Sequence, residues 1–327
     1  MNNIVKSFEK IKVAVLGDIM LDVYVHGHVS RISPEAPVPV LNAEQREARL
    51  GGAGNVALNL KSLGAEPVIY SVIGCDENGV QTENLLTLAG IDSSGIIKSP
   101  HRTTTRKTRL IGNRMQMLRI DEEIVDPLHK EDEKQLLSQL SERLQKGDIH
   151  AIIFVDYDKG VLTETCISAA IEMANRHRIL TTVDPKLKNF NRYKGVTLFK
   201  PNRKELYEGL KKEMSCFSWE EMKKNMQQFA EQQDIKLLMV TLSECGMALY
   251  EREASRFYRE EAHLRHISDV SGAGDTVIAV ATLALCAGMK AEAVMRLANL
   301  AGGIVCEYAG VAPIEAEKLN DFKKQIK

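Results

Sequence analysis

Short apolar runs alternate with longer amphipathic stretches along most of this 327-residue chain, and no other feature limits the possible folds as strongly. The apolar runs predict buried strands at residues 11–17, 67–74, 151–156, 179–184, 196–202 and 237–241. Apolar residues three and four positions apart predict amphipathic helices at residues 55–64, 131–144 and 167–176. Alternating strands and helices favour an α/β fold, in which helices cover both faces of a mainly parallel central sheet.

Polar residues stand at or just after the ends of several predicted strands: Asp18, Asp156, Asp184, Asn202 and Thr241. In open parallel sheets, ligands bind beyond the carboxyl ends of the strands. We therefore expect a ligand site at this edge of the sheet rather than on the surfaces of the helices.

Two stretches lack the alternation, residues 22–50 and 103–121. The first contains three prolines and no helical periodicity, and the second alternates around Gly112–Asn113, a turn signal typical of hairpins. Both stretches predict antiparallel strands outside the main sheet. They would form a small β lid inserted in a single domain of residues 1–327.

Composition excludes several classes of partner. Lysine and arginine (43) nearly balance aspartate and glutamate (44), so a formal charge of −1 gives no overall attraction to nucleic acid or anionic membranes. The six cysteines form no C-x-x-C pair, which argues against a zinc site or a disulfide framework. The N-terminus lacks the apolar core of a signal peptide, and no apolar run reaches the ~18 residues of a membrane span. We expect a cytoplasmic protein that binds neither nucleic acid nor membranes.

The segment G-G-A-G-N-V-A-L-N (51–59) contains the string G-x-G-x-x-A, which also occurs in dinucleotide-binding sites. In such sites the string follows a buried strand, whereas here a polar segment precedes it. A glycine turn at the start of a helix fits this context better. The hypothesis of an NAD-linked dehydrogenase is therefore rejected.

The segment D-V-S-G-A-G-D-T (269–276) precedes an apolar run, and two interpretations of its Asp275 are open. Asp275 can simply favour the positive end of a helix dipole. Alternatively, Gly272, Ala273 and Gly274 leave backbone N–H groups accessible to an anion, and Asp275 takes a proton from a hydroxyl that attacks a phosphoryl group held there. A carboxylate beside an anion site weakens binding unless it serves the reaction, so the second interpretation predicts a phosphotransferase.

Both segments, with Gly64 and Gly74 at later spacings after the first, resemble the two signatures of the ribokinase (PfkB) family of carbohydrate kinases. The resemblance covers essentially the whole chain. Within the family, R-I-S-P-E-A-P-V-P-V (31–40) and D-Y-D-K-G (156–160) are similar to the heptose 7-phosphate kinases of lipopolysaccharide-core synthesis. The chain departs from that branch at G-N-R-M-Q (112–116), Lys200 and Leu242.

The resemblance implies a ribokinase-like fold, ATP as the phosphoryl donor and Mg²⁺ as cofactor, and it allows a monovalent cation. The catalytic base and the anion hole that it implies are Asp275 and the trio Gly272, Ala273 and Gly274. The implied nucleotide contacts are Lys200, Asn202, Glu205, Thr241, Ser243, Gly246 and Asn299. Asn202 and Glu205 match the family's N-x-x-E motif, in which Glu205 would hold Mg²⁺ through water.

For the sugar, the resemblance implies contacts with Asp18, Asp22, Gly52 and Asn55. The 7-phosphate requires cations, and the candidates are Arg106, Lys107, Arg114, Arg119, Lys159 and Lys186. Structural alternatives remain open: Asp18 as a turn cap, Glu205 as a helix-start acid, Lys200 as a surface lysine, Asn299 as a helix-packing residue, and the hairpin cations as charges on a solvated edge strand. Cys286 and Cys306 are expected in the core.

The resemblance predicts ATP-dependent phosphorylation of the anomeric hydroxyl of D-glycero-D-manno-heptose 7-phosphate to the 1,7-bisphosphate. The alternatives are another sugar or sugar-phosphate kinase of the family, and a non-catalytic sensor of sugar and nucleotide, which would have no use for a base in the anion site. Many similar kinases are fused to a nucleotidyltransferase domain. This chain ends at Lys327 without one, so we expect a stand-alone kinase that pairs through its lid as a homodimer.

Overall fold

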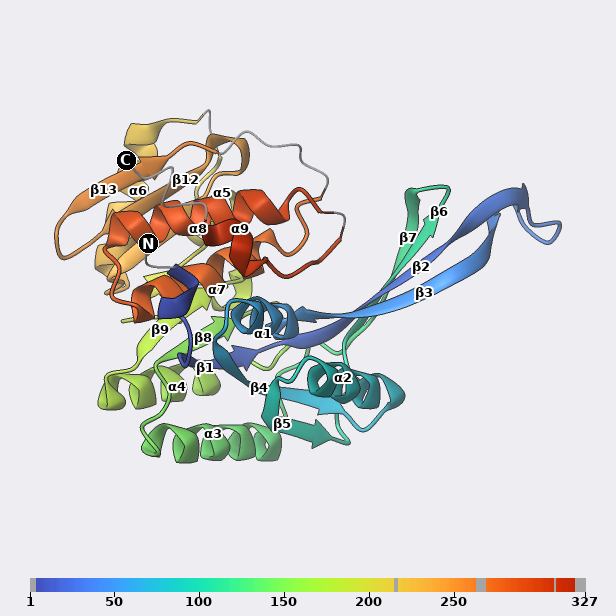
Figure 1. Ribbon diagram of the computed structural model, residues 1–327, viewed down its shortest axis with the longest axis horizontal. Coiled ribbons are helices and arrows are strands. Elements are labelled where there is room, and N and C mark those ends of the chain that lie inside the picture. The colour runs from blue at the N-terminus through green and yellow to red at the C-terminus, as the bar shows by residue number, and fades with distance from the viewer. Residues whose placement is uncertain (1–3, 215–216, 263–268, 309, 321–327) are drawn as a thin grey trace.

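The computed structural model describes residues 4–214, 217–262, 269–308 and 310–320, and its central feature is a nine-stranded sheet (Figure 1). The strands lie in the order β13-β12-β11-β10-β9-β8-β1-β4-β5. Their bounds are β1 Lys12–Gly17, β4 Glu66–Gly74, β5 Asp92–Ser99, β8 Ala151–Val155, β9 Leu180–Asp184, β10 Leu198–Phe199, β11 Leu237–Thr241, β12 Met247–Glu251 and β13 Arg256–Glu260. Only β12 pairs antiparallel with its neighbours β11 and β13, so the prediction of a mainly parallel sheet is confirmed.

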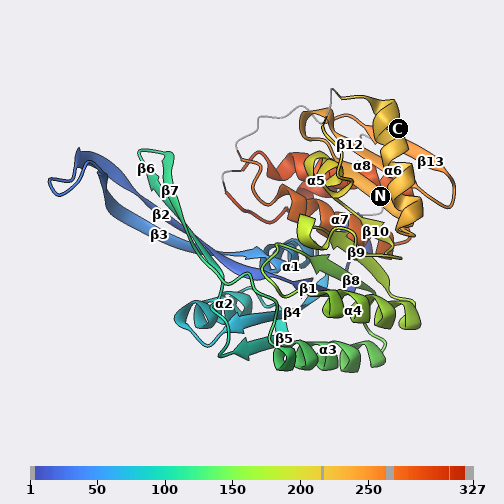
Figure 2. The same ribbon diagram turned by 180° about the vertical axis from the view of Figure 1, so that it is seen from behind.

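Helices cover both faces of this sheet (Figures 1 and 2). One face carries α1 Ala53–Ser62, α7 Ala273–Cys286, α8 Ala291–Val305 and α9 Ala316–Asn320. The opposite face carries α3 Lys130–Gln145, α4 Glu164–His177, α5 Arg203–Gly209 and α6 Trp219–Gln232. In β1, Val13 and Val15 belong to the first core and Ala14 and Leu16 to the second. A strand buried on both faces needs apolar residues at every position, which explains the unbroken apolar runs of the sequence.

Helix α7 places the segment 269–276 at the edge of the sheet. Every residue of this helix from Asp275 to Ala284 is buried, and the helix packs against α1 and α8. Its one polar residue deep in the apolar run, Thr282, shares a hydrogen bond of 2.7 Å with Thr182 of β9. Because α7 is held along its length, its first turn and the side chain of Asp275 are fixed relative to the sheet.

A second, four-stranded sheet extends away from the helices and the main sheet, and we call it the lid (Figure 2). Its strands are β2 Ile19–Ile32, β3 Pro39–Gly52, β6 Arg106–Gly112 and β7 Met115–Glu122, in the order β3-β2-β6-β7. β2 with β3 and β6 with β7 form antiparallel hairpins, while β2 and β6 pair in parallel and join the hairpins. Helix α2 Glu77–Leu88 lies beside the base of the lid. These strands fall largely in the two stretches that lacked helix–strand alternation and extend beyond them to Ile19, Gly52 and Glu122. The prediction of antiparallel strands holds within each hairpin but not between β2 and β6, which pair in parallel.

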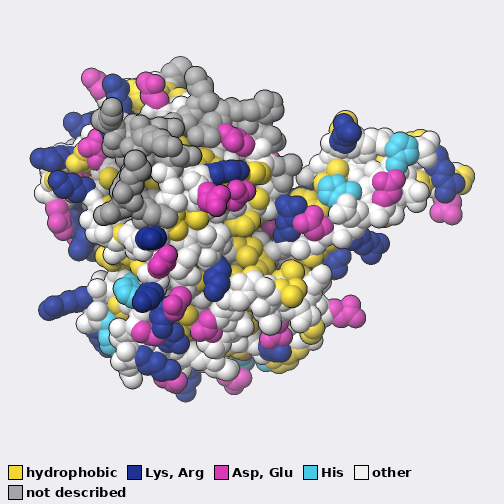
Figure 3. Space-filling view, in the orientation of Figure 1, with side chains coloured by type: hydrophobic (Ala, Val, Ile, Leu, Met, Phe, Trp, Pro, Cys, Tyr) yellow, Lys and Arg dark blue, Asp and Glu magenta, His cyan; other side chains and the backbone are white. Residues whose placement is uncertain are grey.

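The two faces of the lid differ in chemistry. The strand register places polar side chains together on one face: Asp22, Tyr24, Glu47, Arg49, Lys107, Arg109, Arg119 and Asp121. The other face carries mostly apolar side chains: Leu21, Val23, Val25, Ala48, Leu110, Leu118 and Ile120. Figure 3 shows the lid as an arm with side chains of both charges. We call these the polar and the apolar face of the lid.

The predicted α/β class and its added β layer are confirmed, but three main-sheet strands were not predicted. β5, β12 and β13 were missed, and the predicted strand at 196–202 shrinks to Leu198–Phe199 with one isolated bridge between Asn202 and Thr241. β13 and β5 lie at the two edges of the sheet, where burial on both faces is not required and the sequence pattern is weak. Short 3-10 helices occupy Ile4–Ser7, Leu187–Asn189 and Ser243–Cys245. None of the helices in the described ranges is long and apolar enough to cross a lipid bilayer.

Candidate active site

A cavity of about 550 Å³ opens at the carboxyl edge of the main sheet. Its polar lining comes from the ends of successive strands: Tyr157 follows β8, Asp184 ends β9, Lys200 follows β10 and Thr241 ends β11. Of the polar strand ends noted in the sequence, Asp184, Asn202 and Thr241 line this cavity. The start of α7 closes one side of it, so residues of the segment 269–276 and the strand ends face the same space.

Asp275 lies at this junction and is only 2% exposed. Its Oδ2 accepts a hydrogen bond of 2.7 Å from Asn55 Nδ2, and its Oδ1 accepts one of 2.9 Å from the hydroxyl of Tyr157. The pKa of Asp275 is raised to about 7, because burial and, to a smaller extent, the Asp184 carboxylate raise it more than Asn55, Tyr157 and Lys200 lower it. A carboxyl group whose pKa is near neutrality can take up and release a proton at physiological pH, as a general base must.

The backbone in front of Asp275 has the shape that an anion site requires. Gly272 has a φ of 79°, and a Cβ at this position would lie 2.9 Å from Asn55 Nδ2, so both conformation and space require glycine. The N–H of Ala273 donates to the carbonyl of Val270 at 3.3 Å. The N–H groups of Gly274 and Asp275 follow in the first turn of α7, where N–H groups have no partner within a helix. An anion bound here would lie against the positive end of the α7 dipole.

Lys200 and Asp184 form a buried ion pair beneath this turn. Lys200 Nζ lies 3.0 Å from Asp184 Oδ1, and the two residues are 2% and 6% exposed. A Cβ on Gly274 would lie 3.5 Å from Lys200 Nζ and 3.3 Å from Asp184 Oδ2. The surface-lysine interpretation of Lys200 is therefore wrong: the ammonium group is buried beside the first turn of α7.

Asn202 and Glu205 begin helix α5 with reciprocal hydrogen bonds. Asn202 Oδ1 accepts from the N–H of Glu205 at 2.8 Å, and Glu205 Oε2 accepts from the N–H of Asn202 at 2.8 Å. Lys186 donates to the other carboxylate oxygen of Glu205. Burial lowers the pKa of Lys186, but Asp184 and Glu205 raise it more, so the lysine stays charged. Glu205 is thus both the helix-start acid that sequence reasoning allowed and part of the cavity wall.

Tyr157 is the functional candidate that sequence reasoning missed. Its hydroxyl donates a hydrogen bond to Asp275, and its ring faces the ammonium group of Lys186, whose Nζ lies 5.5 Å from the ring centroid. Burial raises the pKa of Tyr157 well above its ordinary value, and the Asp275 carboxylate adds to the effect, so the phenol remains a neutral donor. The available signal was its position directly after the strand-end residue Asp156 in D-Y-D-K-G, of which only Lys159 was selected.

The rest of the cavity suits a flat, less polar group. Ser243, Gly246 and Asn299 line it as expected, together with the apolar residues Val270, Met247, Val277 and Ala262. Asn299 is 8% exposed and donates from Nδ2 to the carbonyl of Glu261 at 2.8 Å. Cys306, expected in the core, lines the cavity instead and is partly exposed, and Cys286 is also only partly buried.

Asp18 and Asp22, both predicted to contact the sugar, lie in different surroundings. Asp18 accepts hydrogen bonds from the N–H groups of Tyr157, Lys159 and Val161 at 2.8, 3.0 and 3.1 Å, which fits the turn-cap alternative. Asp22 lies on the polar face of the lid and pairs with Arg109, a cation that sequence reasoning did not select. A Cβ on Gly51 would lie 2.2 Å from Asp22 Oδ2, so the neighbouring strand leaves room for this carboxylate only because it has glycine there.

The other predicted sugar residues, Gly52 and Asn55, lie where β3 meets α1. Gly52 has a φ of 56°, and a Cβ there would lie 2.3 Å from the carbonyl oxygen of Asp18. Asn55 is 1% exposed. Its Nδ2 donates a hydrogen bond to Asp275, and its Oδ1 accepts one from Asn59 Nδ2 at 3.3 Å. In this structure Asn55 holds Asp275 and Gly52 allows the close approach of Asp18, and direct contact of either residue with a sugar stays a prediction.

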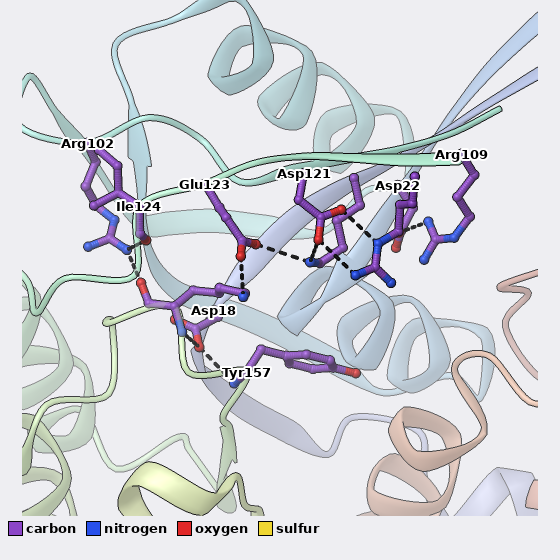
Figure 4. Close-up of polar contacts among 11 residues, drawn as sticks. Asp18, Asp22, Arg102, Arg109, Asp121, Glu123, Ile124 and Tyr157 are labelled. Carbon is purple, nitrogen blue, oxygen red and sulfur yellow. Dashed lines mark hydrogen bonds and ion pairs between the residues drawn. The ribbon is translucent and has the colours of Figure 1, made fainter. Parts of the chain in front are cut away.

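The predicted phosphate-binding cations separate into distinct groups. Lys107, Arg119 and Lys159 meet acidic side chains at the base of the lid, where Figure 4 shows Asp121 and Glu123 among them. Arg106 lies on the opposite face of the lid beside Glu122, at 3.4 Å. Arg114 occupies the β6–β7 turn, and Lys186 lies on Glu205 in the cavity. Lys186 therefore lines the cavity and is separate from the lid cations.

The fold and the site together define the class of protein: an α/β protein with a mainly parallel sheet, an added four-stranded sheet and a buried carboxylate at a glycine-rich helix start. The profile of the pfkB family carbohydrate kinases matches residues 10–318, and the chain belongs to this family. It is a carbohydrate kinase.

Curated relatives cover nearly all of this chain. It is 40% identical over 309 residues to the bifunctional protein HldE of Geobacter metallireducens, covering 93% of this chain and 61% of the relative. It is 39% identical over 308 residues to the bifunctional protein HldE of Helicobacter pylori, and this match covers 94% of this chain and 66% of the relative. The chain therefore spans less than two thirds of the length of these relatives.

Solved structures share the fold at low sequence identity. Phosphofructokinase-2 from Escherichia coli in complex with potassium has a TM-score of 0.80 at 18% identity and covers 96% of this chain and 98% of that one. The ribokinase of Arabidopsis thaliana complexed with ribose and ATP has a TM-score of 0.72 at 16% identity, with coverage of 96% and 99%. At these identities the likeness supports the fold alone.

Proposed function

We propose that this kinase transfers the γ-phosphoryl group of ATP to the anomeric hydroxyl of D-glycero-D-manno-heptose 7-phosphate, giving the 1,7-bisphosphate for lipopolysaccharide-core synthesis. The observation that carries the chemistry is the position of Asp275, a buried carboxyl group with a pKa of about 7 beside an anion-binding helix start. The similarity to the HldE proteins and the segments 31–40 and 156–160 support the heptose branch.

In this mechanism the cavity binds ATP. The apolar residues that line the cavity would surround the base, and Lys186, Lys200 and the start of α7 would hold the triphosphate. The N–H groups of Gly274 and Asp275, with the dipole of α7, stabilise the charge that develops on the transferred phosphoryl group. Asp275 accepts the proton of the attacking hydroxyl, while Asn55 and Tyr157 keep its carboxylate in place.

The residues at the cavity wall fit a magnesium ion held through water. Glu205 and Asp184 offer hard carboxylate oxygens, and each is already neutralised by a lysine, so neither forms a dedicated cluster of free ligands. Mg²⁺ keeps several of its waters and commonly binds through one or two carboxylates and substrate phosphates. When bound, it would neutralise the charge of the ATP phosphates. The only group of three clustered metal-binding side chains among the described residues is His101, His129 and Glu131, which are exposed and do not line the cavity.

The apolar face of the lid supports a homodimer. β7 is an edge strand whose side chains are all exposed, including Leu118 at 56% and Ile120 at 44%. Exposed edge strands with apolar side chains are normally covered by a partner or by another element. Pairing of two lids would cover these residues and leave the polar face toward the substrate.

A screen of sugar phosphates with ATP and Mg²⁺, with ADP release as the readout, tests the proposed reaction. We expect heptose 7-phosphate to be phosphorylated with a kcat/KM well above those of free heptose and of fructose 6-phosphate. The anomeric position of the new phosphate is then identified by ³¹P NMR. Turnover of fructose 6-phosphate in preference to heptose 7-phosphate would move the chain to another branch of the family, and absence of turnover with every sugar would favour the sensor hypothesis.

A further inference from the structure

One carboxylate at the base of the lid holds two lysines. Glu123 Oε1 accepts a hydrogen bond from Lys159 Nζ at 2.8 Å, and Glu123 Oε2 accepts one from Lys107 Nζ at 3.2 Å. All three side chains are largely buried, with exposures of 21% for Glu123, 16% for Lys159 and 13% for Lys107. Burial raises the pKa of Glu123, but the hydrogen bonds from Lys159 and Lys107 lower it more, so the group is an ionised carboxylate.

These residues come from separate parts of the chain. Lys107 lies in β6, Glu123 directly follows β7, and Lys159 lies in the loop after β8. The backbone of Lys159 is fixed by its N–H, which donates to Asp18 at 3.0 Å, and by its carbonyl, which accepts from Arg102. Figure 4 shows Glu123 pointing from the lid strand toward the loop that carries Tyr157. The backbone that carries Lys159 is therefore held in place by contacts that do not involve Glu123.

The surrounding charges add a third cation. Asp121, on the polar face of the lid, lies 3.3 Å from Lys107 Nζ and accepts two hydrogen bonds from Arg119, at 2.8 and 2.9 Å. Lys107 thus divides its charge between Asp121 and Glu123. Arg119 is the nearest further donor, joined to the lysines through Asp121.

We propose that Lys107 and Lys159 form the subsite for a phosphate group that the sugar substrate already carries, and that Glu123 fills this subsite as an internal anion until the phosphate displaces it. The inference rests on the proposed function and specifies how that function selects its substrate. A carboxylate and a phosphate both present oxygens a little over 2 Å apart, so two lysines that converge on one can converge on the other. The phosphate monoester carries more charge and one more oxygen.

This arrangement excludes neutral sugars without a steric barrier. A sugar without a phosphate has nothing that competes with Glu123 for the lysines, so the ion pairs between the lid and the loop after β8 persist. A sugar phosphate replaces the carboxylate with a stronger partner and binds lid and loop together. Selection then follows from the difference in affinity that the two lysines have for the substrate phosphate and for the Glu123 carboxylate.

The test measures binding of inorganic phosphate to the full chain by isothermal titration calorimetry, with Mg²⁺ and a saturating non-hydrolysable ATP analogue to fill the nucleotide phosphate sites. We expect Glu123→Gln to bind phosphate about tenfold or more tightly than wild type, because the competing charge is gone. Lys107→Met and Lys159→Met should each weaken phosphate binding by about tenfold or more. Glu122→Gln, which removes the neighbouring carboxylate on the opposite face, is the matched control and should leave phosphate affinity unchanged.

Two results would overturn the proposal. Phosphate affinity in Glu123→Gln that is equal to or weaker than wild type would show that Glu123 only braces the lid. Unchanged affinity in both lysine variants would remove the subsite, and these variants decide the question if Glu123→Gln fails to fold. Inorganic phosphate reports on the subsite independently of the sugar. If the protein binds phosphate as predicted but does not phosphorylate heptose 7-phosphate, the phosphate subsite is supported and the heptose assignment is wrong.

Discussion

As the proposed general base, Asp275 combines two requirements that conflict in most proteins. A general base must be accessible to its substrate and ionised, yet this carboxylate is buried and faces a second carboxylate, Asp184. Asn55 and Tyr157 each donate to one of its oxygens, and Lys200 neutralises Asp184 at 3.0 Å. The balance leaves the pKa of Asp275 near 7, where it is both ionised in part and basic enough to accept a proton.

Asp275→Asn should reduce kcat by about 10²–10⁴, because asparagine fills the same space but cannot accept the proton. Steady-state turnover with the best substrate of the screen measures this loss. Binding of ATP and the circular-dichroism spectrum should stay close to wild type, since the remaining oxygen can accept from Asn55 and the Tyr157 hydroxyl can accept from the new amide nitrogen. A variant that retains wild-type kcat would leave Asp275 with only its helix-dipole role.

Tyr157→Phe should shift the acidic limb of the kcat/KM pH profile upward by about one pH unit, because a hydrogen bond that favours the ionised form of Asp275 is lost. The shift is upward because activity requires ionised Asp275, so kcat/KM rises as the pH passes through the pKa of this group. A higher pKa moves that rise to higher pH. Asp184, Lys186 and Lys200 face the same site and are unchanged in the variant.

The matched control is Tyr193→Phe. Tyr193 is also buried, and its hydroxyl donates to Asp156 Oδ2 at 2.6 Å, outside the cavity. This variant should lose stability without a shift in the pH profile. An unshifted profile in Tyr157→Phe would mean that the phenol does not act on the base.

At the scale of elements, the lid hairpin β6–β7 depends on two residues with positive φ, Asn113 at 53° and Arg114 at 68°. Two-residue hairpin turns with both residues in this region match the twist of the strands but favour Asn and Gly. Asn113 also fixes the tip to β2: its Oδ1 accepts from the N–H of Val29 at 3.2 Å, and its Nδ2 donates to the Val29 carbonyl at 3.0 Å. Arginine is less favourable than asparagine or glycine at a position with positive φ, so Arg114 is the more strained of the two turn residues.

Arg114→Gly should therefore stabilise the hairpin by up to about 1 kcal/mol, because glycine adopts a positive φ without the steric cost of a Cβ. Asn113→Gly should destabilise it, since the variant loses both hydrogen bonds to Val29 while relieving little strain. Hydrogen exchange of the β6 and β7 amides measures both effects. Equal protection in the two variants would show that the turn does not limit the opening of the hairpin.

At the scale of the whole molecule, the lid is a sheet with one face toward the site and one edge strand exposed. The polar face brings Asp22, Lys107 and Arg109 toward the loop that carries Tyr157, whereas the apolar face and β7 have side chains that no described element fully covers. Function and association can therefore use opposite faces of the same four strands.

Replacing Leu118 and Ile120 together by aspartate should convert a homodimer to a monomer, because charges on the apolar face would be buried without partners in a lid–lid interface. Light scattering at working concentration measures the mass. Leu88→Asp on α2, where the side chain is 84% exposed, is the control and should leave the mass unchanged. A wild-type chain that is already monomeric, or a double variant that remains dimeric, would exclude pairing through the lid.

The sequence by itself determined the features that depend on neighbouring residues. Strands buried on both faces need unbroken apolar runs, so β1, β4, β8, β9 and β11 were predictable, and β5, β12 and β13, which include the two edges of the sheet, were not. The position of Asp275 at a glycine-rich helix start was also predictable, because turn and cap are local. The roles proposed for residues such as Asn202 and Glu205 came from the family resemblance.

Only the tertiary structure decided which charges meet. Asn55 and Asp275 are 220 positions apart, and Tyr157 and Asp275 are 118 apart, yet they share hydrogen bonds. The sequence shows which residues are cations but not where they lie. It could not show that Lys186 pairs with Glu205 or that Arg106 lies on the apolar face of the lid. It also could not show that Lys107 and Lys159 share the carboxylate of Glu123. A charge in a sequence has no fixed partner, because ion pairing depends on distance and burial, and both are set by how distant segments pack.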